Sequence, residues 1–93
     1  MSFTIKYTGE FKKAYKRCMK RGYNMQLLIE TLTILQRTGS LPKEYKPHKL
    51  SGNYAGKWEC HIQPDWLLVW MQDNEELTLL MLHTGTHSDI FGK

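Results

Sequence analysis

The side chains of this sequence that are best suited to moving protons are three histidines and one aspartate, spread over fewer than half of its 93 positions. They are His48, His61, Asp65 and His87. An imidazole with an ordinary pKa of about 6.5 can donate and accept protons near neutral pH, and a carboxylate can orient it or act as a base. Three cations lie near them in the sequence, Lys46, Lys49 and Lys57. Such groups suit phosphodiester cleavage, in which an attacking hydroxyl loses a proton, a leaving oxygen gains one, and charge on phosphorus is stabilised.

Each of these residues also has an ordinary structural interpretation. A histidine on the polar face of a strand, such as His61, is often only solvated, and Asp65 follows Pro64 in a dipeptide typical of a turn. A zinc site is the competing use of histidines. However, Thr-Gly-Thr separates His83 from His87, which disfavours a helix there, and no CxxC or HExxH motif is present. We therefore expect no metal ion or other cofactor.

The hydrophobic pattern predicts the elements that must position these groups. Alternation over residues 3–7 predicts a short half-buried strand. After the N-cap Thr8, apolar residues at helical spacing predict a first helix that ends at Gly22. A second helix is predicted from the N-cap Asn24 to Gly39, so the two helices form an antiparallel pair joined by a short turn.

The second half of the chain is predicted to be a loop followed by a sheet. Prolines and glycines interrupt residues 40–56, which predicts a long loop. Alternation predicts a half-buried strand over 57–63, and the apolar runs 66–71 and 77–82 predict two further strands. The tail 83–91 is polar and interrupted by turn residues, so it has no predicted element.

We therefore predict one α+β domain over residues 1–93, with an N-terminal strand and a two-helix hairpin packed on one face of a small antiparallel sheet. Hydrophobic residues make up 41% of the chain and charged residues 24%, which is typical of a folded protein. No apolar run is long enough to span a membrane, and no signal peptide is evident. We expect a cytoplasmic protein in which Cys18 and Cys60 are reduced and partly buried.

The net charge of +4 is distributed unevenly along the chain. Residues 1–50 hold 11 Lys/Arg and 3 Asp/Glu, whereas residues 51–93 hold 2 and 6. A basic segment of this kind predicts a polyanionic partner, most commonly nucleic acid, or an acidic protein. Charge alone does not choose between these two partners.

Three segments of the sequence resemble the YafQ branch of the RelE/ParE toxin superfamily. They are residues 45–50 (YKPHKL), 61–70 (HIQPDWLLVW) and 84–92 (TGTHSDIFG). The resemblance extends over essentially the whole chain. It implies a microbial-ribonuclease-like fold and a toxin of a type II toxin–antitoxin pair that cuts mRNA in the ribosomal decoding site. Its implied partners are a cognate antitoxin, the ribosome, mRNA and ribosomal RNA.

Taken position by position, the resemblance places active-site groups at the four residues selected above. It adds Trp66 and Phe91 as residues that shape the site and contact RNA, whereas the apolar pattern alone favours packing roles for both. The position before Thr84 is commonly arginine in this superfamily, where it would contact the scissile phosphate, and here it is His83. The resemblance therefore implies that a protonated His83, Lys46 or another lysine contacts the RNA phosphate.

The resemblance implies a ribosome-dependent endoribonuclease. In this reaction the 2′-hydroxyl of the substrate attacks the adjacent phosphate and leaves a 2′,3′-cyclic phosphate and a 5′-hydroxyl. His87 is the expected general acid, Asp65 or His48 the base, and His61 positions the groups or shares the proton transfers. We expect the lysine-rich first helix to contact ribosomal RNA. The alternative, suggested by His83, is a weak or non-enzymatic member that only binds an antitoxin or another acidic protein. A gyrase-poisoning toxin is disfavoured because it has no use for the histidine and aspartate set.

Overall fold

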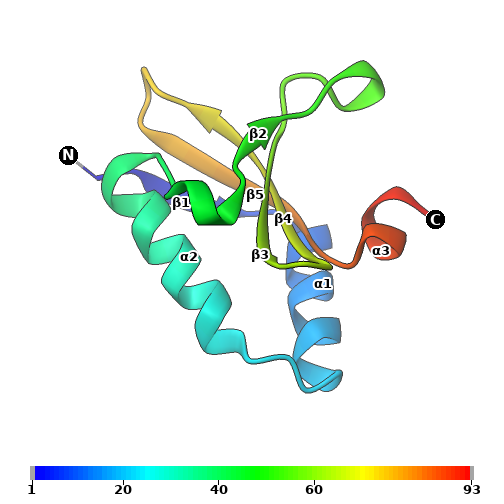
Figure 1. Ribbon diagram of the computed structural model, residues 1–93. Helices are drawn as coiled ribbons and strands as arrows, with labels where there is room; N and C mark the ends of the chain where they lie inside the picture. The colour runs from blue at the N-terminus through cyan, green and yellow to red at the C-terminus, as the bar shows by residue number, and fades with distance from the viewer. Residues whose placement is uncertain (1, 93) are drawn as a thin grey trace.

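A computed structural model describes residues 2–92, in which a five-stranded sheet is combined with two long helices and one short one (Figure 1). In chain order the elements are β1 (Thr4–Tyr7), α1 (Gly9–Lys20), α2 (Met25–Thr38), a 3-10 turn (Lys43–Tyr45), β2 (His48–Lys49), a second 3-10 turn (Gly52–Tyr54), β3 (Trp58–Gln63), β4 (Trp66–Asp73), β5 (Thr78–Gly85) and α3 (His87–Phe91). No helix in this part of the chain has the length and apolar character needed to cross a membrane.

The strands lie in the order β1-β5-β4-β3-β2, and the sheet is mixed. Strands β3 to β5 pair antiparallel, as predicted, and β2 adds to them antiparallel, whereas β1 pairs parallel to β5 at the sheet edge. The α+β fold is therefore confirmed, but the N-terminal strand is an edge strand of the sheet and does not pack on its face with the helices. Parallel strands need a long crossover connection, and the α1–α2 hairpin lies within the connection that separates β1 from the rest of the sheet.

The two predicted helices are confirmed, together with their capping residues. The Thr8 side chain accepts a hydrogen bond from the backbone N–H of Phe11 at the start of α1, and Asn24 caps α2 in the same way. Gly39 ends α2 with a φ of 72°. A Cβ at Gly39 would lie 2.6 Å from the ring of Phe3, so this turn also requires glycine for space.

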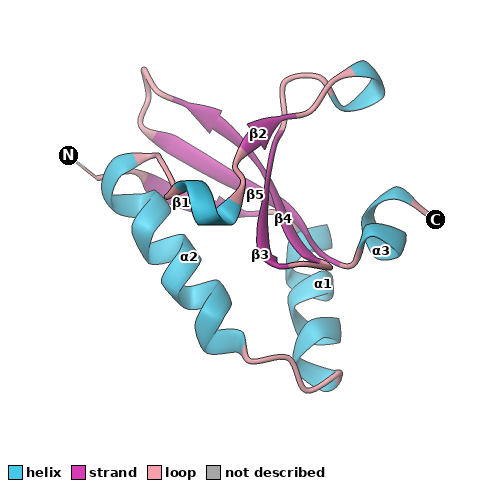
Figure 2. Cartoon of the chain, viewed as in Figure 1, coloured by secondary structure: helices cyan, strands magenta, loops and turns pink. Residues whose placement is uncertain are grey.

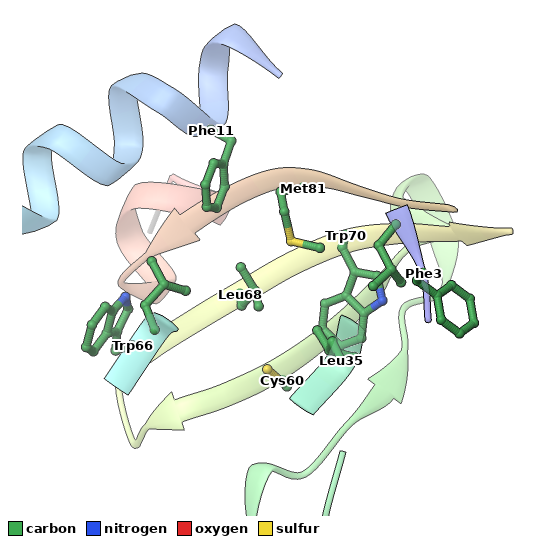
Figure 3. Packing of buried hydrophobic residues seen from close by; sticks show 10 residues of the cluster. Phe3, Phe11, Leu35, Cys60, Trp66, Leu68, Trp70 and Met81 are labelled. Carbon is green, nitrogen blue, oxygen red and sulfur yellow. The ribbon is translucent and has the colours of Figure 1, made fainter. Parts of the chain in front are cut away.

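The hydrophobic core lies between these helices and one face of the sheet (Figure 2). Phe11 of α1 and Leu35 of α2 pack into one cluster with Leu68 and Trp70 of β4 (Figure 3). Both helices thus cover the same face, as predicted. Cys60 belongs to this cluster, and its burial raises the pKa of its thiol to about 12, which makes it unsuited to act as a nucleophile.

Three features of the second half were not predicted: the two-residue strand β2, the extension of β5 through Gly85, and α3. The extension of β5 buries Thr84, whose hydroxyl accepts a hydrogen bond from Trp66 Nε1 (2.9 Å) and donates one to the Leu67 carbonyl (2.8 Å). Thr86 and Asp89 then form a capping box at the start of α3. Polar residues in the tail are therefore used to make local structure.

Candidate active site

The strand register aligns two rows of residues across the sheet face that points away from the helices. In the first row, His48 of β2 lies opposite Glu59 of β3. Val69 of β4 and then His83 of β5 continue this row. Residues paired in this way point to the same face with Cβ atoms about 4.5–5.5 Å apart. The short strand β2 therefore determines that His48 faces Glu59.

The second row contains the other predicted groups. His61 lies opposite Leu67, which in turn pairs with Gly85 at the end of β5. His87 follows two residues later as the first residue of α3, and Asp65 lies in the turn between β3 and β4. The His61 ring lies between the two other histidines, with centroids 6.3 Å from His48 and 5.9 Å from His87. The structure thus brings all four predicted groups together.

Asp65 holds His87 through two hydrogen bonds. Its Oδ1 accepts one from the His87 backbone N–H (3.0 Å) and one from the ring Nδ1–H (2.6 Å). These bonds, the backbone one first, lower the pKa of Asp65 below its ordinary value. An ionised carboxylate only accepts, so the proton resides on Nδ1 and the ring is oriented, which leaves Nε2 for proton exchange with a substrate. The His87 side chain is 50% exposed.

His48 uses both of its ring nitrogens within the protein. Nδ1 lies 2.8 Å from the carbonyl oxygen of Lys46, which can only accept, and Nε2 lies 3.1 Å from Oε1 of Glu59. A protonated His48 ring paired with an ionised Glu59 satisfies both contacts. In that state, His48 has no lone pair available to act as a base.

Glu59 is the site residue that the sequence interpretation missed. Its side chain is 5% exposed, and Oε1 also lies 4.0 Å from Nε2 of His61. Its second carboxylate oxygen, Oε2, is buried without a hydrogen-bond partner. Because buried carboxylates are costly, an incompletely paired one requires an explanation. The signal in the sequence was its position two residues before His61, on the same polar face of the strand.

His61 differs from its neighbours in that no hydrogen bond occupies either ring nitrogen within residues 2–92. Its side chain is 24% exposed and its nearest acidic group is Glu59, 4.0 Å away. Its ring nitrogens are therefore free of hydrogen bonds and lie beside an acidic side chain. This is the arrangement expected for a proton acceptor.

His83 lies on the same face but outside this cluster. Its Nε2 is 3.6 Å from Oε1 of Glu10 in α1, and its Nδ1 is 3.1 Å from the Thr84 carbonyl. It lines a small cavity of about 110 Å³ together with Tyr54 and Lys57. His83, at the position that is commonly arginine in this superfamily, thus has an acidic neighbour, Glu10.

The predicted RNA-contacting aromatic residues occupy different environments. Trp66 is 2% exposed and packs edge-on against Tyr23, with 4.8 Å between ring centroids. Trp66 therefore packs in the core, and its ring has little surface available for direct contact with RNA. Phe91 is half-buried in α3, where its ring lies 6.4 Å from that of His87 and edge-on to Tyr54 at 5.1 Å.

Lysines lie beside the histidine cluster, whereas the described residues form no metal-binding group. Lys46 is exposed beside His48, and Lys57 Nζ lies 5.4 Å from the ring centroid of Tyr54. Across residues 2–92, no group of three His, Cys, Asp or Glu side chains is arranged to hold a metal ion. The described residues of the site are therefore proton-transfer groups with lysines nearby.

Gly85 has a steric role that leads to a first prediction. Its φ is 145°, and a Cβ there would lie 2.6 Å from Oδ2 of Asp89. We expect Gly85→Ala to lower the free energy of unfolding by about 1–3 kcal/mol and to reduce RNA cleavage, because α3 must shift. Gly92→Ala is the matched control, since Gly92 also has a positive φ (73°) but open space around it. Thermal unfolding and cleavage measured on both variants test this, and equal effects would contradict it.

Comparison with known proteins agrees with this fold. The family model described as bacterial toxin of type II toxin-antitoxin system, YafQ, matches residues 3–92. The mRNA interferase toxin YafQ of Escherichia coli K12 is 36% identical over 89 residues, which are 95% of each chain. The crystal structure of YafQ from E. coli BL21(DE3) is 34% identical with a TM-score of 0.89, covering 97% of this chain and 99% of that one. The E. coli DinJ-YafQ toxin-antitoxin complex contains a chain that is 33% identical with a TM-score of 0.88, covering 99% and 100%. This chain therefore belongs to the YafQ family of bacterial toxins of type II toxin–antitoxin systems.

Proposed function

We propose that this chain is an endoribonuclease toxin that cleaves mRNA on the ribosome and is neutralised by a cognate antitoxin. The observation that carries the proposal is the group of three histidines with Asp65 and Glu59 on one face of the sheet, in a member of the YafQ family. The mRNA interferase activity named for the E. coli relative and the DinJ-YafQ complex support it. The proposal includes a cytoplasmic location, because ribosome-bound mRNA is the proposed substrate.

His87 is the proposed general acid. With Nδ1–H bonded to Asp65, a protonated ring presents Nε2–H to the leaving 5′-oxygen. The 2′-oxygen forms a bond to phosphorus while the bond from phosphorus to the 5′-oxygen breaks, and the proton from Nε2 goes to that oxygen. Asp65 keeps the ring in the required tautomer and stabilises its charged form, as a carboxylate does in hydrolase triads.

His61 is the proposed general base that takes the proton of the 2′-hydroxyl. The residue roles expected from the resemblance gave this step to Asp65 or His48. However, the hydrogen bonds from His87, the backbone one first, lower the pKa of Asp65 and make it a weaker base, and both ring nitrogens of His48 are engaged by Lys46 and Glu59. His61 has the free lone pair, and Glu59 stabilises the imidazolium that forms.

Lys46 is the proposed contact for the scissile phosphate. Lys46 is exposed, and its backbone carbonyl accepts a hydrogen bond from His48. This contact holds the residue at the edge of the histidine cluster, from which its side chain can extend to a bound phosphate. His83 is less suited to this role because Glu10 lies 3.6 Å from its ring. A weak or non-enzymatic toxin is the second candidate, since the site lacks an arginine at this position.

The test is primer extension on mRNA from cells that express the protein, combined with analysis of the RNA ends. We expect cuts within translated regions that carry 2′,3′-cyclic phosphate and 5′-hydroxyl ends, and protection of untranslated RNA. Growth arrest with intact mRNA would support the second candidate instead. Cuts in purified RNA at the same rate as on ribosomes would contradict ribosome dependence.

The basic face of α1 leads to a second prediction. Lys13 and Lys20 are exposed, and neither forms an ion pair with another described residue. We expect the logarithm of the ribosome binding constant to fall linearly with the logarithm of the salt concentration, because phosphates that bind the protein release counterions. Lys13→Gln combined with Lys20→Gln should reduce that slope by about 2. Arg37→Gln on α2 is the control and should leave the slope unchanged. A salt-independent affinity would contradict the role of α1.

A further inference from the structure

The helix α3 carries His87 and Phe91, yet it is only five residues long. A helix this short does not form stably without tertiary contacts, because helix nucleation is unfavourable. The position of the proposed acid therefore depends on groups elsewhere in the fold that hold α3. One of these is Asp65, which lies beside the reacting groups. Another comes from the opposite end of the sequence.

That second group is Arg21, the C-cap residue of α1. Its guanidinium forms two parallel hydrogen bonds with Asp89 of α3, from Nη1 to Oδ2 (2.6 Å) and from Nη2 to Oδ1 (3.0 Å). The side chain of Arg21 is 38% exposed and that of Asp89 13%. Bidentate pairs of this type fix orientation as well as distance, and a lysine reproduces only the charge.

Asp89 transmits this contact to the residue that precedes His87. Its Oδ2 also accepts a hydrogen bond from the backbone N–H of Thr86 (2.9 Å), and the Thr86 hydroxyl accepts one from the Asp89 N–H (3.1 Å). The Arg21 bond is the main cause of a pKa for Asp89 far below the ordinary carboxyl value, so the aspartate is ionised near neutral pH. The tight fit at Gly85 leaves the carboxylate little room to move.

We propose that Arg21 is a positioning residue for His87, which it orients through Asp89 and the first turn of α3. Arg21 itself contacts no reacting group. The proposal rests on the proposed function, in which His87 is the general acid. It assigns to Arg21 a role different from that of the neighbouring lysines of α1, which we expect to affect RNA binding only.

The test compares Arg21→Gln, Arg21→Lys, Asp89→Asn and the Arg21→Gln/Asp89→Asn double variant. Asn retains an oxygen for the Thr86 N–H but loses the charge that holds Arg21. In single-turnover cleavage on programmed ribosomes, we expect each neutral variant to lower the saturating rate about 10- to 100-fold with half-saturation unchanged. The double variant should be no slower than either single one, and Arg21→Lys should recover part of the rate. Arg17→Gln is the matched control, because Arg17 is an exposed cation of the same helix without this contact, and it should change half-saturation only.

A second measurement uses the free protein and does not depend on RNA cleavage. NMR of the His87 ring should show the Nδ1 proton bonded to Asp65 in the wild type, and its loss or exchange broadening in Arg21→Gln. Unchanged His87 signals in a folded Arg21→Gln protein would overturn the proposal. So would a wild-type saturating rate in that variant, or additive losses in the double variant. A wild-type protein that leaves mRNA intact would instead contradict the proposed function, and the NMR result would still decide the role of Arg21.

Discussion

Replacement of His87 by alanine is expected to lower the saturating rate of mRNA cleavage about 10²- to 10⁴-fold, because the leaving 5′-oxygen then lacks a positioned acid. The half-saturating toxin concentration should change little, since proton donation is needed in the transition state and not for binding. Single-turnover cleavage on programmed ribosomes separates the two quantities. His87→Ala that cleaves at the wild-type rate would exclude the acid role.

The pH dependence of the same reaction provides a sharper criterion. A general acid acts only in its protonated form, so the wild-type rate should fall on the alkaline side, and His87→Ala should lose this limb. Asp65→Asn should keep an acceptor for the His87 backbone N–H but no longer stabilise the charged ring. We expect its alkaline limb to move to lower pH. Glu30→Gln, an exposed substitution on α2, is the control and should leave the profile unchanged.

The helices and three long strands could be predicted because their apolar periodicity or apolar runs extend over six or more residues and because Thr8, Asn24 and the following glycines are capping residues. The two-residue strand β2 has no periodicity to detect, although its pairing places His48 opposite Glu59. The helix α3 is also too short for a periodic signal. Its capping box, from Thr86 to Asp89, was nevertheless visible in the sequence as a T-x-x-D motif.

The proton-transfer groups could be chosen from the sequence because histidine and aspartate are recognisable by type, whereas their states depend on partners. The sequence shows that His48 and His61 are both candidates for proton transfer. Only the fold shows that both ring nitrogens of His48 already contact other protein groups. The low exposure of Glu59 depends on packing from several segments, which strand alternation does not describe. The Arg21–Asp89 pair joins residues 68 positions apart, so no local pattern contains it.

Substitution of Glu59 by glutamine is expected to lower activity without lowering stability. The amide has nearly the same size as the carboxylate but no charge, so His48 loses its counter-ion and the imidazolium formed at His61 is no longer stabilised. Loss of a preorganised electrostatic contact of this kind costs about 10²-fold in rate. Because the wild-type carboxylate is buried with Oε2 unpaired, removal of its charge also removes an unfavourable desolvation cost. The free energy of unfolding should therefore be unchanged or higher.

Thr84→Val provides the matched contrast, because Thr84 of β5 is also a buried polar residue of the same sheet. Its hydroxyl is fully paired with Trp66 and Leu67, so the substitution leaves the indole N–H without a partner. We expect Thr84→Val to lower the free energy of unfolding by about 1–3 kcal/mol. Chemical denaturation and single-turnover cleavage should be measured on both variants. If Glu59→Gln loses stability as Thr84→Val does and still cleaves at the wild-type rate, Glu59 supports the fold only. Loss of activity in a protein of equal or greater stability is the behaviour of a residue that is kept buried and incompletely paired because the reaction uses its charge.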